Sequence, residues 1–75
     1  MIETYKKHLI VASASLDEIT GKYISFAMIS WRRDARREIH SLETSNESYD
    51  HPDTAMYFGV ASGKNWIDDK LGIEP

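Results

Sequence analysis

The sequence predicts a small α+β domain: a three-stranded antiparallel β-meander with one long C-terminal helix packed on one face (β-β-β-α). Two observations predict this fold. The last third of the chain repeats its apolar residues with the period of a helix, and the part before it alternates strand-like segments with polar turns. A chain of 75 residues is the size of one small domain, so residues 1–75 are expected to fold as a single unit.

Two of the three strands are indicated by alternation. The first is expected over Tyr5 to Ser13 and is followed by a connection over Leu16–Lys22 with the turn signal Thr20-Gly21-Lys22. The second is expected over Tyr23 to Arg32, where large apolar side chains alternate onto both faces, a pattern typical of a strand covered on both sides. One face carries Tyr23, Ser25, Ala27, Ile29 and Trp31, and the other carries Ile24, Phe26 and Met28.

The segment 33–43 is compatible with either a strand or a helix. Its composition favours a helix, on which Trp31, Ala35, Ile39 and Leu42 share one face. A third strand over Arg37–Thr44 is the favoured interpretation, because two strands under one helix make a poor core. The polar stretch Ser45–Asp50 is then expected to be a loop anchored by Tyr49.

The C-terminal helix is expected over Pro52–Leu71. Asp50 or His51 can cap its start and Pro52 suits the first turn, while Lys70 and Gly72 are stop signals. A glycine inside a helix costs ~1 kcal/mol relative to alanine, so Gly59 and Gly63 are expected to permit close packing against another element. The predicted apolar face consists of Ala55, Met56, Gly59, Val60, Gly63, Trp66, Ile67 and Leu71.

A family resemblance covers about half the chain, from Arg36 to Lys70. This run contains RREIHSLET, then an aromatic residue, and then DTA, FG and ASGKNWID. It resembles small uncharacterised bacterial β-meander domains that share a basic turn, a short strand and a C-terminal helix ending in a Trp-Ile-Asp signature. The resemblance implies this fold, and it implies no activity, cofactor or catalytic residue.

No motif in the sequence indicates an enzyme. The histidines His8, His40 and His51 fall on different predicted elements without metal-ligand spacing, so neither a metal nor another cofactor is expected. The chain has no cysteine, and neither Gly-x-Ser-x-Gly nor Ser-x-x-Lys is present to mark a nucleophilic serine. We therefore expect no catalytic residues.

The arginines Arg32, Arg33, Arg36 and Arg37 form the sharpest candidate for a binding site. Four guanidinium groups can bind phosphates, with Trp31 beside them available for stacking, so binding of an anion or nucleic acid is one hypothesis. Lys6 and Lys7 extend the cluster if the first strand lies next to it. The competing interpretation is a solvated hairpin tip that Asp34 and Glu38 partly neutralise. A chain with a net charge of −3 would also repel nucleic acid elsewhere on its surface.

The favoured hypothesis is an interaction module that self-associates as a homodimer. A domain of this size buries only ~60% of its unfolded surface, and without cysteine it has no disulfide to stabilise it. One helix covers one face of a sheet, so Ile24, Phe26 and Met28 on the other face are the candidate self-association surface. The absence of cysteine and of a convincing signal peptide predicts a cytoplasmic protein that does not associate with a membrane.

Overall fold

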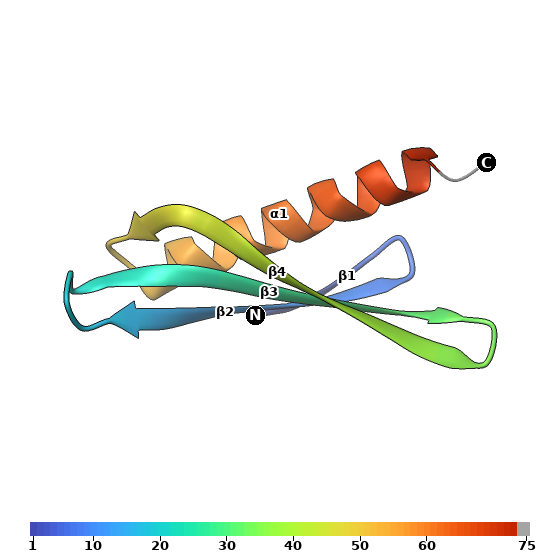
Figure 1. Ribbon diagram of the computed structural model, residues 1–75, viewed down its shortest axis with the longest axis horizontal. Coiled ribbons are helices and arrows are strands. Elements are labelled where there is room, and N and C mark those ends of the chain that lie inside the picture. Colours follow the sequence, from blue (N-terminus) through green and yellow to red (C-terminus); the bar gives the residue numbers. More distant parts are fainter. Residues whose placement is uncertain (74–75) are drawn as a thin grey trace.

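The computed structural model describes residues 1–73, with side chains described for residues 1–42 and 48–72. Four strands pair in sequence order, each antiparallel to the next, and one helix lies across one face of the sheet (Figure 1). The α+β class and the meander with a helix on one face are confirmed, but the prediction of three strands was one too few. The elements are β1 (Ile2–Tyr5), β2 (His8–Asp17), β3 (Lys22–Arg33), β4 (Arg36–Tyr49) and α1 (Pro52–Ile73).

The predicted first strand is wrong at its N-terminal end, where Lys6 and Lys7 form a tight turn between β1 and β2. Both residues are left-handed, with φ of 48° and 65°, and Tyr5 pairs with His8 across the turn. Two-residue hairpin turns of this kind usually contain Asn-Gly, and Lys-Lys gives no such signal in the sequence. The strand β2 also continues to Asp17, past the predicted end, so the connection to β3 is shorter than expected.

The strand interpretation of segment 33–43 is confirmed, although β4 is much longer than predicted. It runs to Tyr49, which pairs with Tyr23, so the expected loop Ser45–Asp50 belongs almost entirely to the strand. Asn, Ser and Glu are poor strand formers, and this composition explains the error. A register irregularity between Ile24 and Phe26 allows β4 to accommodate extra residues at this point.

The helix α1 begins at Pro52 as predicted and extends two residues beyond the predicted end. Gly72 lies inside it and does not terminate it. Most of the predicted apolar face is buried against the sheet, whereas Leu71 is 38% exposed. The buried positions of that face are Ala55, Gly59, Val60, Gly63 and Ile67.

Close packing at the two glycines is confirmed. A Cβ atom on Gly59 would lie 3.0 Å from the carbonyl oxygen of Phe26, and one on Gly63 would lie 3.0 Å from Cγ2 of Ile10. The Ser25 hydroxyl, which is completely buried, donates a hydrogen bond of 2.6 Å to the carbonyl oxygen of Ala55. These contacts hold the first half of α1 close to β2 and β3.

Towards its C-terminus α1 diverges from the sheet (Figure 1). Larger side chains fill the widening space, and the indoles of Trp31 and Trp66 lie with ring centroids 5.4 Å apart. The imidazoles of His8 and His40 flank them at 5.4 and 4.4 Å. The buried core between these aromatic rings and the glycines consists of Ile10, Ala12, Ile29, Val60 and Ile67.

Candidate functional site

The face of the sheet turned away from α1, here called the open face, is not covered by any element of the described chain (Figure 1). Side chains alternate between the two faces of a strand, so residues opposite one another in the register share a face. Met28 lies opposite Val11 and Ser41, and Phe26 lies opposite Ser13. Besides these residues, the open face carries Ile2, Leu9, Ile24, Ser30 and Ile39.

Large apolar side chains on the open face are accessible to solvent. Met28 is 45% exposed, Ile39 is 59% exposed and Ile2 is 70% exposed. These three side chains come from three different strands and share one face, whereas other exposed apolar side chains, such as Ile19 and Tyr57, lie elsewhere. Exposed apolar groups gathered on one sheet face are typical of an association surface.

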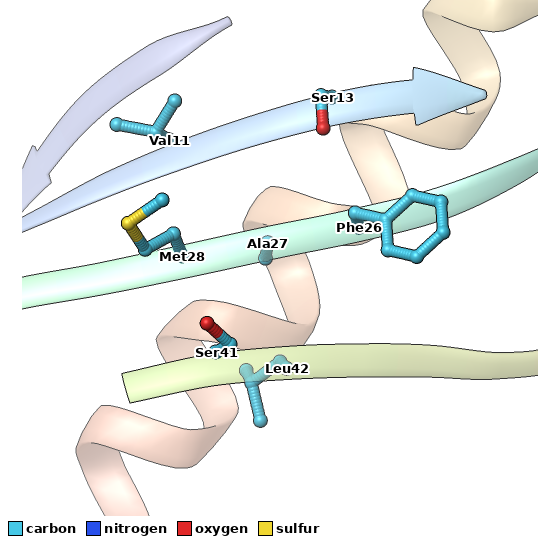
Figure 2. Close-up of a pocket in the computed structure, with 7 residues that line it drawn as sticks. All are labelled: Val11, Ser13, Phe26, Ala27, Met28, Ser41 and Leu42. Atoms are coloured by element: carbon cyan, nitrogen blue, oxygen red, sulfur yellow. The ribbon is translucent and has the colours of Figure 1, made fainter. Parts of the chain in front are cut away.

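The centre of the open face is hollowed. Its concavity of about 520 Å³ is lined by Val11 and Ser13 on β2, Phe26 and Met28 on β3, and Ser41 on β4 (Figure 2). The concavity forms because short serine side chains lie beside longer apolar ones. No described residue that lines the concavity is charged, so its surface recognises shape and apolar groups and offers only hydroxyls for hydrogen bonding.

The structure places the three predicted surface residues on the open face, as the alternation along β3 requires. Phe26 and Met28 line the concavity, whereas Ile24 lies further along β3, opposite Ser15. Sequence reasoning did not include Val11 and Ile39 in this surface. Alternation within each strand shows which residues share a face with Val11 or Ile39. It does not show that this face is the one that carries Phe26 and Met28, because that depends on the strand register, which no local pattern provides.

The predicted basic cluster lies at the tip of the β3–β4 hairpin. Arg32 pairs directly with Arg37, and Arg33 pairs with Arg36. The β1–β2 turn and the last turn of α1 lie at the same end of the molecule (Figure 1), so the condition for Lys6 and Lys7 to extend the cluster is met. We call this the basic end, and its members are Lys6, Lys7, Arg32, Arg33, Arg36, Arg37 and Lys70.

A concavity of about 280 Å³ lies among these side chains on the helix side. It is lined by cations from three segments that are far apart in the sequence: the β1–β2 turn, the end of β3 and the end of α1. Lys70 was missed in the sequence analysis, because its position depends on how far α1 continues and on which strand ends beside it.

Lys70 is fixed by His8 and Trp31. Its ammonium lies 3.7 Å from the centroid of the Trp31 ring and 3.1 Å from Nε2 of His8. Nδ1 of His8 lies 2.7 Å from the carbonyl oxygen of Lys6 and donates to it, which leaves Nε2 as the acceptor for Lys70. The ammonium therefore occupies the space over the indole in which the sequence suggested a base could stack.

The three histidines are not brought together as a metal site. His8 and His40 lie under α1 on either side of the two tryptophans, and His51 is exposed just before the helix. Within the described residues, no group of three histidine, cysteine or acidic side chains is arranged to hold a metal ion.

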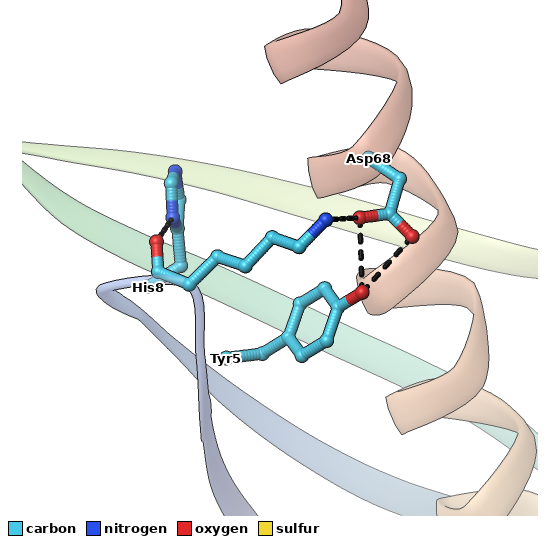
Figure 3. Close-up of polar contacts among 4 residues, drawn as sticks. Tyr5, His8 and Asp68 are labelled. Carbon is cyan, nitrogen blue, oxygen red and sulfur yellow. Dashed lines mark hydrogen bonds and ion pairs between the residues drawn. The ribbon is translucent and has the colours of Figure 1, made fainter.

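A polar cluster joins the β1–β2 turn to α1 (Figure 3). The Asp68 carboxylate accepts hydrogen bonds from Nζ of Lys6 at 2.6 Å and from the Tyr5 hydroxyl at 2.9 Å. The hydrogen bonds from Lys6 and then Tyr5 lower the pKa of Asp68 below its usual 3.8. The hydrogen bond to Asp68 raises the pKa of Lys6 above its usual 10.5.

No protein-family model matches this chain, and neither do curated proteins or solved structures compared with it. The resemblance of Arg36 to Lys70 to small bacterial β-meander domains therefore stays a prediction. Within the described part of the chain, no helix has both the length and the apolar composition needed to cross a membrane.

Proposed function

We propose that this protein is an interaction module without catalytic activity and that it forms a homodimer through its open face. The observation that carries the proposal is that Phe26 and Met28 of the strand β3 line an uncovered concavity whose described lining is uncharged. The absence of cysteine is consistent with activity in the cytoplasm, where we expect the module to work.

A second copy of the chain is the occupant that the charges favour. Each copy carries a net charge of −3, so two copies repel one another over most of their surfaces. The described lining of the concavity is uncharged, which makes this face the region where identical chains meet with the least repulsion. A two-fold axis through the face places the projecting Phe26 and Met28 of one protomer against the hollow of its partner.

Burial of these side chains matters at this size. Complete burial of a fully exposed side chain of this size contributes roughly 1.5–3 kcal/mol. Met28 and Ile39 are 45% and 59% exposed, so covering them contributes about half of this each, and the half-buried Phe26 adds less. Small domains have total stabilities of about 5 kcal/mol at the lower end of the usual range. Association through the open face can therefore supply a large share of the stability of the folded chain.

Sedimentation equilibrium at low micromolar concentration tests the proposal. We expect a mass of twice 8.6 kDa for the wild-type chain and of 8.6 kDa for Met28→Lys, because that substitution places two like charges near the two-fold axis. Leu16→Lys is the matched control, since Leu16 is 52% exposed and lies on the helix side of the sheet, opposite Tyr23.

The control is expected to remain a dimer, and circular dichroism checks that both variants fold. A monomeric wild-type chain contradicts the proposal, and so does a Met28→Lys variant that stays dimeric.

A further inference from the structure

The tip of the β3–β4 hairpin projects as a two-stranded ribbon. The pairing of β3 with β2 ends at Ser30, opposite Leu9, whereas pairing with β4 continues to Arg33 and Arg36. Three residue pairs of β3 and β4 therefore continue beyond the last pair with β2, a length of about 10 Å at ~3.3 Å per residue. The β1–β2 turn and the end of α1 flank this ribbon on the helix side. The major groove of B-DNA is about 8.5 Å deep and wide enough to admit a two-stranded ribbon.

Like charges lie opposite one another in this ribbon. Arg32 faces Arg37 and Arg33 faces Arg36, and directly opposed like charges destabilise a strand pair. Within residues whose side chains are described, none of these four arginines forms an ion pair, and only Arg37 makes a hydrogen bond, to Ser30. Asp34 and Glu38 line a concavity together with Arg33 and Arg36 and offset part of this charge, and an anion would compensate the rest.

The β1–β2 turn also places a lysine in an unfavourable backbone conformation at the basic end. Lys7 adopts a left-handed conformation with φ of 65°, which asparagine or glycine adopts more readily. Lys6 in the same turn is occupied by Asp68, but no ion pair of Lys7 is found among the described side chains. Lys7 lines the same concavity as Arg32 and Arg33.

The net negative charge of the chain does not oppose binding at this end. Seven of the nine lysine and arginine residues lie at the basic end, where they outnumber the four acidic residues Asp34, Glu38, Asp68 and Asp69. A second group of acidic residues belongs to the β2–β3 turn and the start of α1 at the opposite end (Figure 1). The molecule is 43 Å long, and charges in water are screened over about 8 Å at physiological ionic strength. An anion at the basic end therefore experiences mainly the local positive field.

We propose that the hairpin tip enters the major groove of double-stranded DNA and that the basic end binds the backbone phosphates on either side. Arg32 and Arg37 lie on one face of the ribbon, and Arg33 and Arg36 lie on the other, so both groove walls have guanidinium partners. Lys7 and Lys70 supply further charge beside the ribbon. The recognition is of phosphate and groove shape, because Lys70 covers the indole that could stack on a base.

Fluorescence anisotropy with a short labelled DNA duplex at low salt tests this inference. The informative variant is Arg32→Gln/Arg36→Gln, which leaves one arginine in each cross-strand pair and so relieves both repulsions. We expect it to be at least as stable as the wild type without DNA, yet to bind the duplex about tenfold more weakly with a shallower salt dependence. Lys22→Gln/Lys64→Gln is the control, because it changes the net charge equally away from the basic end and should bind as the wild type does.

Asp34→Asn provides an independent readout. Asparagine tolerates the left-handed conformation of Asp34, which has φ of 58°, and the substitution removes a carboxylate from the hairpin turn. We expect the variant to bind the duplex several-fold more tightly. The inference would be overturned by equal or tighter binding to single-stranded DNA, or by binding to anionic vesicles but not to the duplex. It would also be overturned if the two double variants lost the same affinity for the duplex. The test is separate from dimer formation, since a monomeric Met28→Lys chain keeps its hairpin tip.

Discussion

Asp68 is the residue through which the β1–β2 turn is attached to α1. Its carboxylate accepts hydrogen bonds from both Lys6 and Tyr5, and all three groups remain partly exposed to solvent (Figure 3). Exposed ion pairs contribute little to stability, but this one joins residues more than sixty positions apart in the chain. It therefore orders the short edge strand β1 against the helix.

The pKa shifts give this contact a defined pH dependence. Because the pKa of Asp68 is lowered in the folded chain, its contribution is present above 3.8 and is lost as the pH falls through the lowered value. Because the pKa of Lys6 is raised, its contribution is present below 10.5 and is lost as the pH rises through the raised value. The contact is thus fully formed near neutral pH.

Asp68→Asn is expected to be less stable than the wild type at pH 7, and this difference should vanish in acid well below pH 3.8. Urea unfolding at the two pH values, at one fixed protein concentration, measures it. Asp69→Asn is the matched control, because Asp69 is an exposed neighbour without an ion pair in the described part of the chain. A loss of stability that persists in acid would contradict the assignment.

Single residues also show where sequence reasoning stops. Phe26 and Met28 could be assigned to one shared face from alternation alone, since the signal lies within one strand. The roles of Lys70 and His8 could not be predicted, because they meet only when the end of α1 and the start of β2 are placed together. Contacts of this kind depend on tertiary structure and leave no local pattern.

At the scale of elements, small residues set the distance between α1 and the sheet. The predicted helix and its apolar face are confirmed because a period of 3.6 residues and a proline at the start are strong local signals. The β1–β2 hairpin was missed because its turn has no glycine or asparagine, and the end of β4 was missed because its residues are polar. In both regions pairing with neighbouring strands outweighs local preference.

Gly59→Ala is expected to destabilise the protein by up to about 2 kcal/mol. Alanine improves helix propensity by ~1 kcal/mol, but its Cβ would lie 3.0 Å from the rigid carbonyl oxygen of Phe26, and overpacking costs about 1–3 kcal/mol. Gly72→Ala is the control, because no atom lies within 4 Å of the added Cβ and the helix should gain slightly. Chemical denaturation of both variants measures their free energies of unfolding. A Gly59→Ala variant as stable as Gly72→Ala would show that the close approach is not required.

At the scale of the whole molecule, two surfaces with different chemistry lie on different parts of the fold. The described residues that line the hollow of the open face are apolar or carry hydroxyls, and the basic end carries most of the positive charge. In a homodimer formed through the open faces, the hairpin tips of both protomers remain outside the concavities that pair. Association and phosphate binding therefore use separate groups and can be removed separately by substitution.

The central claim is that open faces meet in solution, and isotope-filtered nuclear Overhauser spectroscopy on a mixture of labelled and unlabelled chains tests it most directly. The account predicts intermolecular contacts from the Phe26 ring and the Met28 methyl group to Val11, Phe26 or Met28 of the other chain. Intermolecular contacts confined to the exposed edge of β4, or none at all at a concentration where the chain is folded, would contradict it.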